Sequence, residues 1–207
     1  MNKKALSLTL WVVIILLGYF VVKSPLNQVE FEKTFDERKS EVIQSLKDIR
    51  TAQVAYKDKN REYANNFEDL LNFVKNDSLA LVKAIGETPD SLTEEQALKA
   101  GIISRDTIYA SALKSIFNEE YLASRKSKKA FDINTISTVP FSSNSTPFNI
   151  DAGQIEKGKV VVQVFEVSTT FGIFLEGLEA NNKGLVLEDI ISVGSMSEAS
   201  INGNWGE

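Results

Sequence analysis

The sequence predicts an α+β protein in which an N-terminal transmembrane helix continues into an amphipathic helix. This helix packs, together with short helices, against a mostly antiparallel β-sheet. Three observations lead to this prediction: an uncharged apolar run at the N-terminus, a charged segment with a helical apolar period after it, and a strand-like pattern beyond residue 130. The expected regions are residues 1–4 (cytoplasmic N-terminus), 5–22 (transmembrane anchor), 23–62 (amphipathic stalk helix), 63–129 (helical region), 130–193 (antiparallel sheet) and 194–207 (polar tail).

The run from Ala5 to Val22 contains no charged residue. Its length of about 18 residues is near the lower bound for a helix that spans the hydrocarbon core of a bilayer. A cleavable signal peptide has a similar charge layout, but its apolar core is shorter and a small-residue cleavage site follows it. Here the run ends in Lys23, Ser24 and Pro25. We therefore expect an uncleaved anchor, with a break or kink allowed before Pro25.

The charges around the run predict its orientation. Lys3 and Lys4 precede it and no acidic residue does. The positive-inside rule then favours a cytoplasmic N-terminus and an exported C-terminal domain, as in a single-pass protein of the bacterial inner membrane with a periplasmic domain. The whole chain has a net charge of −5, and without the two lysines the remainder has −7. Such an acidic domain is a poor candidate for binding nucleic acid or anionic lipid surfaces.

The composition excludes several kinds of chemistry, because the chain contains no histidine and no cysteine. Catalytic triads with an imidazole base, Cys/His zinc sites and disulfides are therefore absent. Adjacent acids such as Glu119-Glu120 in a helix and Glu188-Asp189 in a strand point to different faces and form no carboxylate pair. A pairing of a serine in 142–145 with Lys128 or Lys129 has little support. We expect no catalytic residue, no cofactor and no metal site.

The segment from Asn27 to Asn60 is predicted to be one amphipathic helix. Its apolar residues recur at steps of three, four and seven, and they are Phe31, Phe35, Val42, Leu46, Ile49, Ala52 and Tyr56. Two interpretations remain open: the stripe packs on this chain's own sheet, or it contacts a partner. For the second we nominate Trp11, Tyr19, Phe31, Phe35, Val42, Leu46, Ile49 and Tyr56. The partners would be other membrane or envelope proteins or copies of the same chain.

The stretch from Asp48 to Phe73 carries a family resemblance. It contains Arg50-Thr51-Ala52-Gln53 and Tyr56, then Asn60-Arg61-Glu62-Tyr63. This pattern resembles the "R-x-A-Q-x-A-Y … G-x-Y" helix of type IV pilin-like proteins and type II secretion pseudopilins. The resemblance implies a membrane helix that continues into an amphipathic helix, followed by a small loop and an antiparallel sheet.

The departures from the family pattern limit what is carried over. Lys4 stands where the family has a glycine before the apolar run, and Thr9 where it has a glutamate. The resemblance therefore does not imply cleavage by a prepilin peptidase. Arg61 also stands where the family often has glycine.

Between residues 63 and 129 we expect short helices. Phe67, Leu70, Leu71 and Val74 point inward from the first. Residues 78–85 extend or restart a helix, and Thr93 begins a capping box for a helix over 94–100 that Gly101 ends. Residues 107–122 have helical spacing. The cluster over 125–129 is either a contact for phosphate or lipid headgroups or a solvated basic turn that balances Glu119 and Glu120.

From residue 130 the alternation predicts about five strands, over 130–141, 148–155, 159–167, 171–175 and 185–193. The turns between them are expected at 156–158 and 181–184, and a loop at 141–147. The tail over 194–207 is either disordered or docked by Trp205, and we favour docking.

These features together predict a non-catalytic, structural or accessory subunit of a larger membrane assembly for secretion or surface-structure biogenesis. One alternative is a membrane-tethered module that binds a ligand or glycan at the loops around 141–148. A carboxylate-dependent hydrolase would need two facing acids, and the sequence offers no such pair.

Overall fold

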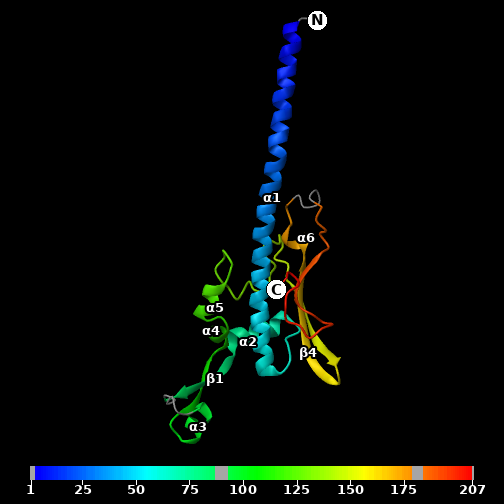
Figure 1. The fold of residues 1–207 in the computed structure, drawn as a ribbon. Coiled ribbons are helices and arrows are strands. Elements are labelled where there is room, and N and C mark those ends of the chain that lie inside the picture. Colours follow the sequence, from blue (N-terminus) through cyan, green and yellow to red (C-terminus); the bar gives the residue numbers. More distant parts are fainter. Residues whose placement is uncertain (1–2, 87–92, 179–183, 207) are drawn as a thin grey trace.

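The computed structural model of the chain describes residues 3–86, 93–178 and 184–206. Helix α1 (Lys3–Asn60) runs through the whole molecule. Its N-terminal half projects alone, and its C-terminal half packs within a head that contains all other elements (Figure 1). The helix passes through Ser24 and Pro25 without interruption, so the break that the sequence allowed there does not occur.

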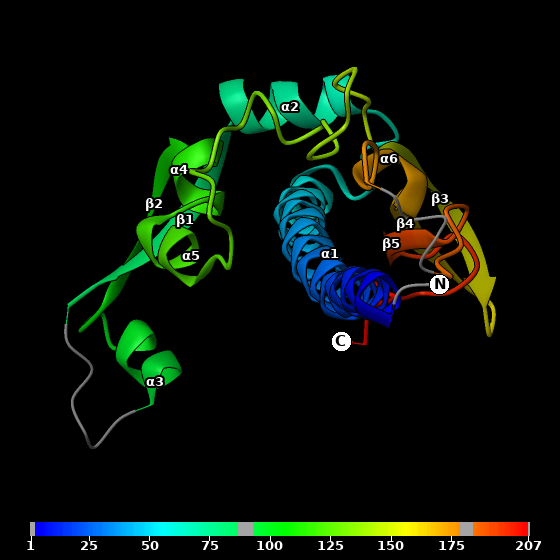
Figure 2. The ribbon, with the colours of Figure 1, turned by 90° about the horizontal axis from the view of Figure 1, so that it is seen from above.

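A three-stranded antiparallel sheet lies along one side of α1 (Figure 2). It consists of β3 (Asn149–Lys157), β4 (Val160–Thr170) and β5 (Ile190–Gly194), in the order β3-β4-β5. The predicted strands over 148–155 and 159–167 are therefore confirmed. The C-terminal tail extends the sheet, because Gly203 forms a bridge with Val193 and the Asn204 amide donates to the Ser192 carbonyl.

The other side of α1 carries α2 (Phe67–Asn76), α4 (Ala112–Ile116) and α5 (Glu119–Ser124). An antiparallel ribbon of β1 (Ser78–Ile85) and β2 (Ser104–Ser111) extends from this layer and bears α3 (Glu94–Lys99). The expected capping box at Thr93 is present, and Gly101 has the left-handed φ expected at the end of this helix. The predicted helix over α2 is also confirmed.

The hydrophobic core lies between α1, the sheet and the α2/α4 layer. It combines the C-terminal stripe of α1 with inward residues of the other elements, chiefly Val42, Leu46, Ile49, Ala52, Leu70, Phe73, Val74, Ala112, Phe165, Val167, Phe174, Ile191 and Val193. The stripe therefore packs on this chain's own sheet and helices, which is the first of the two interpretations. The fold is α+β with antiparallel sheets, as the sequence predicts.

The family-like motif forms the turn that ends α1. Arg61 ends the helix in the left-handed region at φ 69°, and its amide donates to the Lys57 carbonyl at 2.8 Å. The fully buried Gln53 side chain makes two hydrogen bonds to the backbone of Ala64, at 2.7 and 2.9 Å. Tyr63 packs on Phe165 of β4 with ring centroids 4.6 Å apart. These residues therefore fix the chain reversal between α1 and the rest of the head.

Several predicted elements are wrong. Residues 78–85 form strand β1 rather than a helix. The predicted helix over 107–122 is wrong up to Ser111, where the chain forms β2, and is confirmed beyond it only as the two short helices α4 and α5. In both stretches the β1–β2 pairing outweighs a helical spacing that is also compatible with a strand. At the base of the β1–β2 ribbon, the Ala112 amide donates a hydrogen bond to the Asp77 carbonyl at 2.9 Å.

The predicted strands at 130–141 and 171–175 are also wrong. Residues 130–141 form mainly turns. The Asp132 side chain accepts a hydrogen bond from the Asn134 amide at 2.9 Å, and such local hydrogen bonds compete with the backbone hydrogen bonds between paired strands. Phe171–Phe174 form the short helix α6. Of the strand expected over 185–193, residues 190–193 are confirmed as part of β5, whereas 185–189 form turns and irregular backbone. Of the hairpin loop expected at 181–184, residues 181–183 lie outside the described residues.

Candidate membrane and partner interface

The projecting half of α1 presents an apolar surface to solvent. Every residue from Leu10 to Leu17 is exposed, with between 49% and 68% of its surface accessible. Eight consecutive residues cover all sides of a helix, since each successive residue is turned by about 100°. The surface therefore surrounds the helix completely and is not one stripe. Within the residues whose side chains are described, no helix has a stretch long and apolar enough to cross a membrane.

The nominated contact residues fall into three groups. Trp11 is exposed on the projecting half, and the side chain of Tyr19 lies outside the described part of the structure. Val42, Leu46 and Ile49 are completely buried in the head, so they are not available to a partner and their nomination is corrected. Their spacing indicated a buried stripe but could not show which surface covers it.

The remaining nominated residues are half-buried and also pack within the chain. Tyr56 contacts Phe73 of α2 edge-on, with ring centroids 5.2 Å apart. Phe31 stacks on Phe35, and Phe35 contacts Phe171 of α6 at 5.9 Å. These contacts are therefore internal to the chain.

Arg38 strengthens the junction where α1 leaves the head. Its Nη1 donates to the carbonyls of Phe174 and Glu176, each at 2.9 Å. A charged donor on two backbone acceptors forms stronger hydrogen bonds than neutral groups do. The neck formed by Phe31, Phe35, Arg38 and α6 thus holds the projecting helix in a fixed direction relative to the sheet.

The basic cluster over 125–129, here called the basic strap, lies along α1. Its best-buried contact is the ion pair between Arg125 Nη2 and Asp48 Oδ2 at 2.8 Å, with side-chain exposures of 11% and 4%. Tyr121 donates to Asp48 Oδ1 at 2.9 Å. Burial, together with the neighbouring Asp48 carboxylate, raises the pKa of the Tyr121 hydroxyl.

The other contacts of the strap follow one polar row on α1. Glu41 accepts from the Ser127 hydroxyl at 2.5 Å and from the Lys128 amide at 2.7 Å. Gln44 accepts from the Lys126 amide at 2.9 Å. Lys128 Nζ pairs with Glu37 at 2.9 Å, and the hydrogen bond from Lys128 lowers the pKa of that carboxyl group.

The interpretation of the basic cluster as a turn that balances Glu119 and Glu120 is wrong, because Arg125 and Lys128 pair with Asp48 and Glu37 of α1. The contact with phosphate or lipid headgroups stays a prediction. The strap fastens the chain after α5 onto the row Glu37, Glu41, Gln44 and Asp48, which the sequence shows as steps of four, three and four. That spacing was a usable signal, but nothing in the sequence showed which segment would lie on it.

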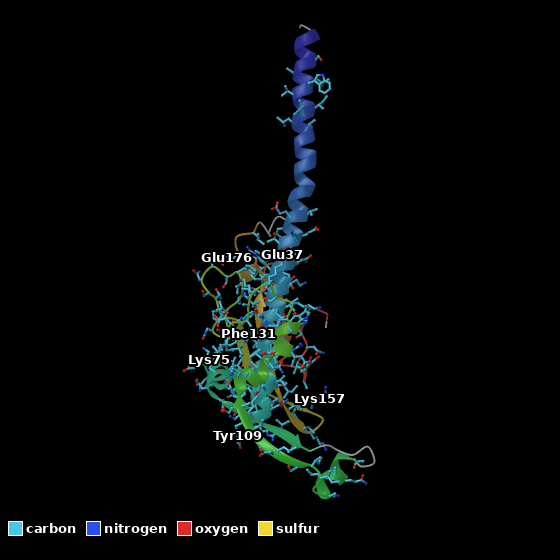
Figure 3. The ribbon with its side chains drawn as sticks, turned by 90° about the vertical axis from the view of Figure 1, so that its left-hand side faces the viewer. Glu37, Lys75, Tyr109, Phe131, Lys157 and Glu176 are labelled. Carbon is cyan, nitrogen blue, oxygen red and sulfur yellow. The ribbon has the colours of Figure 1, made fainter. Side chains whose placement is uncertain are left out.

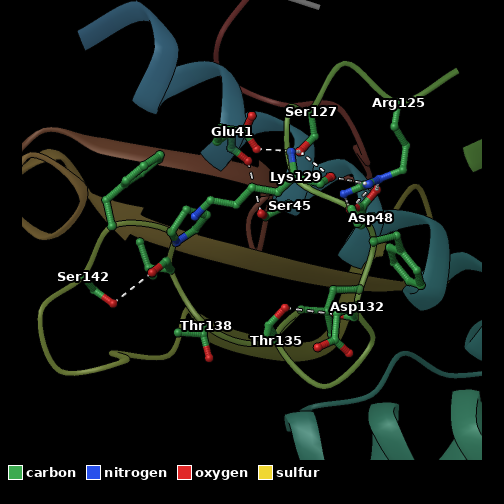
Figure 4. A pocket seen from close by; sticks show the side chains of 16 residues that line it. Glu41, Ser45, Asp48, Arg125, Ser127, Lys129, Asp132, Thr135, Thr138 and Ser142 are labelled. Carbon is green, nitrogen blue, oxygen red and sulfur yellow. Dashed lines mark hydrogen bonds and ion pairs between the residues drawn. The ribbon is translucent and has the colours of Figure 1, made fainter. Parts of the chain in front are cut away.

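A cavity of about 300 Å³ lies beneath the strap, between α1 and residues 130–142 (Figure 4). Phe131 and Phe141 form part of its wall. Their rings already contact cations, Arg125 at 5.2 Å from Phe131 and Lys129 at 4.5 Å from Phe141. The carboxylates of Glu41 and Asp48 are engaged by the strap. The cavity is of ligand size, but it offers no free aromatic face for a sugar ring.

The acidic residues do not gather into a metal site in the part of the chain that the structure describes. There, no group of three or more acidic side chains is placed to hold a metal ion. Glu119 and Glu120 are both exposed in the first turn of α5, where they lie at a helix N-terminus that favours negative charge.

No family model, no curated protein and no solved structure matches this chain.

Proposed function

We propose that this protein is a single-pass membrane-anchored protein of the bacterial envelope, with a cytoplasmic N-terminus and a pilin-like periplasmic head. It acts as a non-catalytic structural or accessory subunit of a larger membrane assembly for secretion or surface-structure biogenesis. The observation that carries the proposal is the apolar surface of Leu10–Leu17, which the head leaves uncovered. Burial of this surface in lipid is favourable because each buried CH₂ group contributes about 0.8 kcal/mol.

The layout of the head supports the pilin-like part of the proposal. One long helix projects at its N-terminal half and packs at its C-terminal half against an antiparallel sheet. The residues that resemble the family pattern, from Ala52 to Tyr63, form the last turns of α1 and the chain reversal that follows it. The neck at Phe35 and Arg38 would then hold the head at a fixed orientation close to the membrane surface.

A cysteine-labelling experiment tests the anchoring, because the chain contains no cysteine of its own. Ile15 and Val29 are almost equally accessible in the isolated chain, at 68% and 64%. In intact cells, Val29→Cys should react with a membrane-impermeant maleimide, and Ile15→Cys should react only after detergent is added. Equal labelling of both positions without detergent would exclude a membrane around Ile15.

A further inference from the structure

The β1–β2 ribbon and α3, here called the arm, stand away from the rest of the head (Figures 1 and 2). The base of the arm is held by contacts such as Lys59 Nζ to the Ser78 carbonyl at 3.3 Å. Asp106, Thr107, Ile108 and Tyr109 are four consecutive exposed residues of β2, and Tyr109 is 76% accessible. Consecutive strand residues face opposite sides, so the described chain leaves both faces of β2 uncovered.

An isolated two-stranded ribbon is only marginally stable in water. One face of the ribbon lies toward α1, since Ala80 and its cross-strand partner Tyr109 line a cavity together with Asp58 and Lys59. The outer backbone edge of β2 pairs with no strand in the described parts of the chain. The arm therefore presents an open strand edge with apolar side chains.

The sheet has a matching open edge on the opposite side of the molecule. The tail covers the outer side of β5 through residues 202–204, whereas β3 has no strand on its outer side among the described residues. At the end of this hairpin Val160 and Val161 are exposed by 60% and 62%. Native proteins seldom leave a nine-residue edge strand without protection.

The two open edges also carry complementary charges at their ends. The first turn of α3 carries two acids, Glu94 and Glu95, and Lys99 lies in its last turn. The turn between β3 and β4 carries Lys157 and Lys159. Within the described residues neither lysine has an ion pair. An acidic arm and a basic hairpin turn attract each other and favour one orientation of docking.

The positions of the two elements are compatible with docking between parallel copies. The arm and the β3–β4 turn lie on opposite sides of α1, and both lie at the end of the head that is farther from the N-terminus (Figures 2 and 3). Lys157 and Tyr109 mark them in Figure 3. Side-by-side copies can therefore bring arm and turn together while all projecting helices point the same way, as anchors in one membrane must.

We propose that the arm of one copy docks on the sheet edge of a second copy, with β2 adding to β3 as a further strand and the acidic end of the arm contacting Lys157 and Lys159. Backbone hydrogen bonds supply such strand addition, and the charges supply its register. The contact is head-to-tail, so a pair of copies still has one free arm and one free β3 edge, and the association continues beyond two copies. The parallel orientation rests on the membrane anchoring proposed above.

Cysteine pairs in the full-length, membrane-bound protein test the docking. Ile108→Cys places a thiol on β2, and Gln154→Cys places one on β3; the chain has no other thiol. Under mild oxidation, the double variant should give a ladder of covalent multimers beyond the dimer, and neither single variant should. A dimer from Ile108→Cys alone would overturn the head-to-tail contact in favour of an arm-to-arm one. A membrane-bound monomer in the double variant would overturn the docking altogether.

Charge reversal supplies the second test, with the cysteine pair as the readout. Lys157→Glu with Lys159→Glu should reduce the multimers by about tenfold, because two attractive pairs become repulsive. Glu94→Lys with Glu95→Lys should do the same, and the two reversals combined should restore the ladder. Glu119→Lys with Glu120→Lys makes an equal charge change on α5 and should have no effect. If the combined variant formed as few cross-linked multimers as either reversal alone, the charge pairing would be overturned.

The same samples distinguish the two proposals. Recovery of the protein outside the membrane fraction would contradict the anchoring. Membrane-bound protein that never cross-links would contradict the docking and leave the anchoring intact.

Discussion

At the scale of single residues, the family-like motif has a structural explanation. Gln53 and Tyr63 hold the reversal after α1, and Arg61 adopts a left-handed conformation at φ 69°. Only glycine adopts this conformation without a steric penalty. The glycine that the resembling families often have at this position is thus explained by the backbone, although here it is an arginine.

Replacing Arg61 with glycine should therefore stabilise the head. We expect Arg61→Gly to raise the free energy of unfolding by about 1 kcal/mol, since it removes the left-handed strain. Urea unfolding of the full-length protein in detergent, followed by Trp205 fluorescence in a Trp11→Phe background, measures the change. Glu62→Gly is the matched control at a neighbouring negative φ, and it should destabilise. A lower midpoint for Arg61→Gly would refute the explanation.

The strap gives a contrast between a buried and an exposed ion pair. Arg125→Met leaves Asp48 buried without its cation and should cost about 3–5 kcal/mol. Lys128→Met breaks the exposed pair with Glu37 and should cost less than about 1 kcal/mol. The same urea assay compares them. Equal losses for the two variants would show that the Asp48 site is not the fastening point of the strap.

Tyr121 should make the stability sensitive to alkaline pH. Its pKa is raised in the folded state, mainly by burial, so the unfolded chain loses this proton at a lower pH than the folded chain does. Its contribution to stability is present below the unfolded pKa of about 10 and is lost as the pH rises above it. The stability difference between the native protein and Tyr121→Phe should therefore shrink from pH 9 to pH 11. A constant difference would contradict the buried, hydrogen-bonded hydroxyl.

At the scale of elements, the strongest local patterns are the ones that the sequence identifies correctly. The helical periods of α1 and α2, the capping box of α3 and the alternation in β4 all agree with the structure. The errors at β1, β2 and α6 share a cause. Their short apolar segments fit either a helix or a strand, and the choice depends on pairing with distant residues, such as the Phe171 amide to the Asp189 carbonyl.

The C-terminal tail is an element whose docking was correctly expected. Trp205 packs on the core and lies beneath Lys47, while Asn204 pairs with Ser192 and with the Ile190 carbonyl. Trp205→Ala should lower the free energy of unfolding by about 2 kcal/mol, roughly half the cost of removing a fully buried tryptophan. Circular dichroism during urea unfolding gives the value, with Ile201→Ala as an exposed control. Identical midpoints for the two variants would mean that the tail contributes nothing to the fold.

At the scale of the whole molecule, α1 combines two different surfaces. The stripe from Val42 to Ile49 is covered by the head, while Leu10–Leu17 remains uncovered. The sequence predicts both as apolar helix but cannot show that the first is internal. It also gives no sign of the arm, whose exposed β2 arises from a pairing between distant segments. The buried part of the stripe is therefore no partner surface, and we propose contacts on the projecting helix, where the sequence already placed Trp11 and Tyr19, and on the two open strand edges.

The central claim is that the full-length chain acts as an uncleaved, membrane-anchored subunit of an assembly. Purification from its native membrane in mild detergent, with the mass, companions and N-terminal residue determined together, tests it most directly. We predict membrane-bound protein with Met1 intact, in particles larger than one copy that contain further copies or other envelope proteins. A single copy that purifies alone from the soluble fraction, with a shortened N-terminus, would contradict the claim.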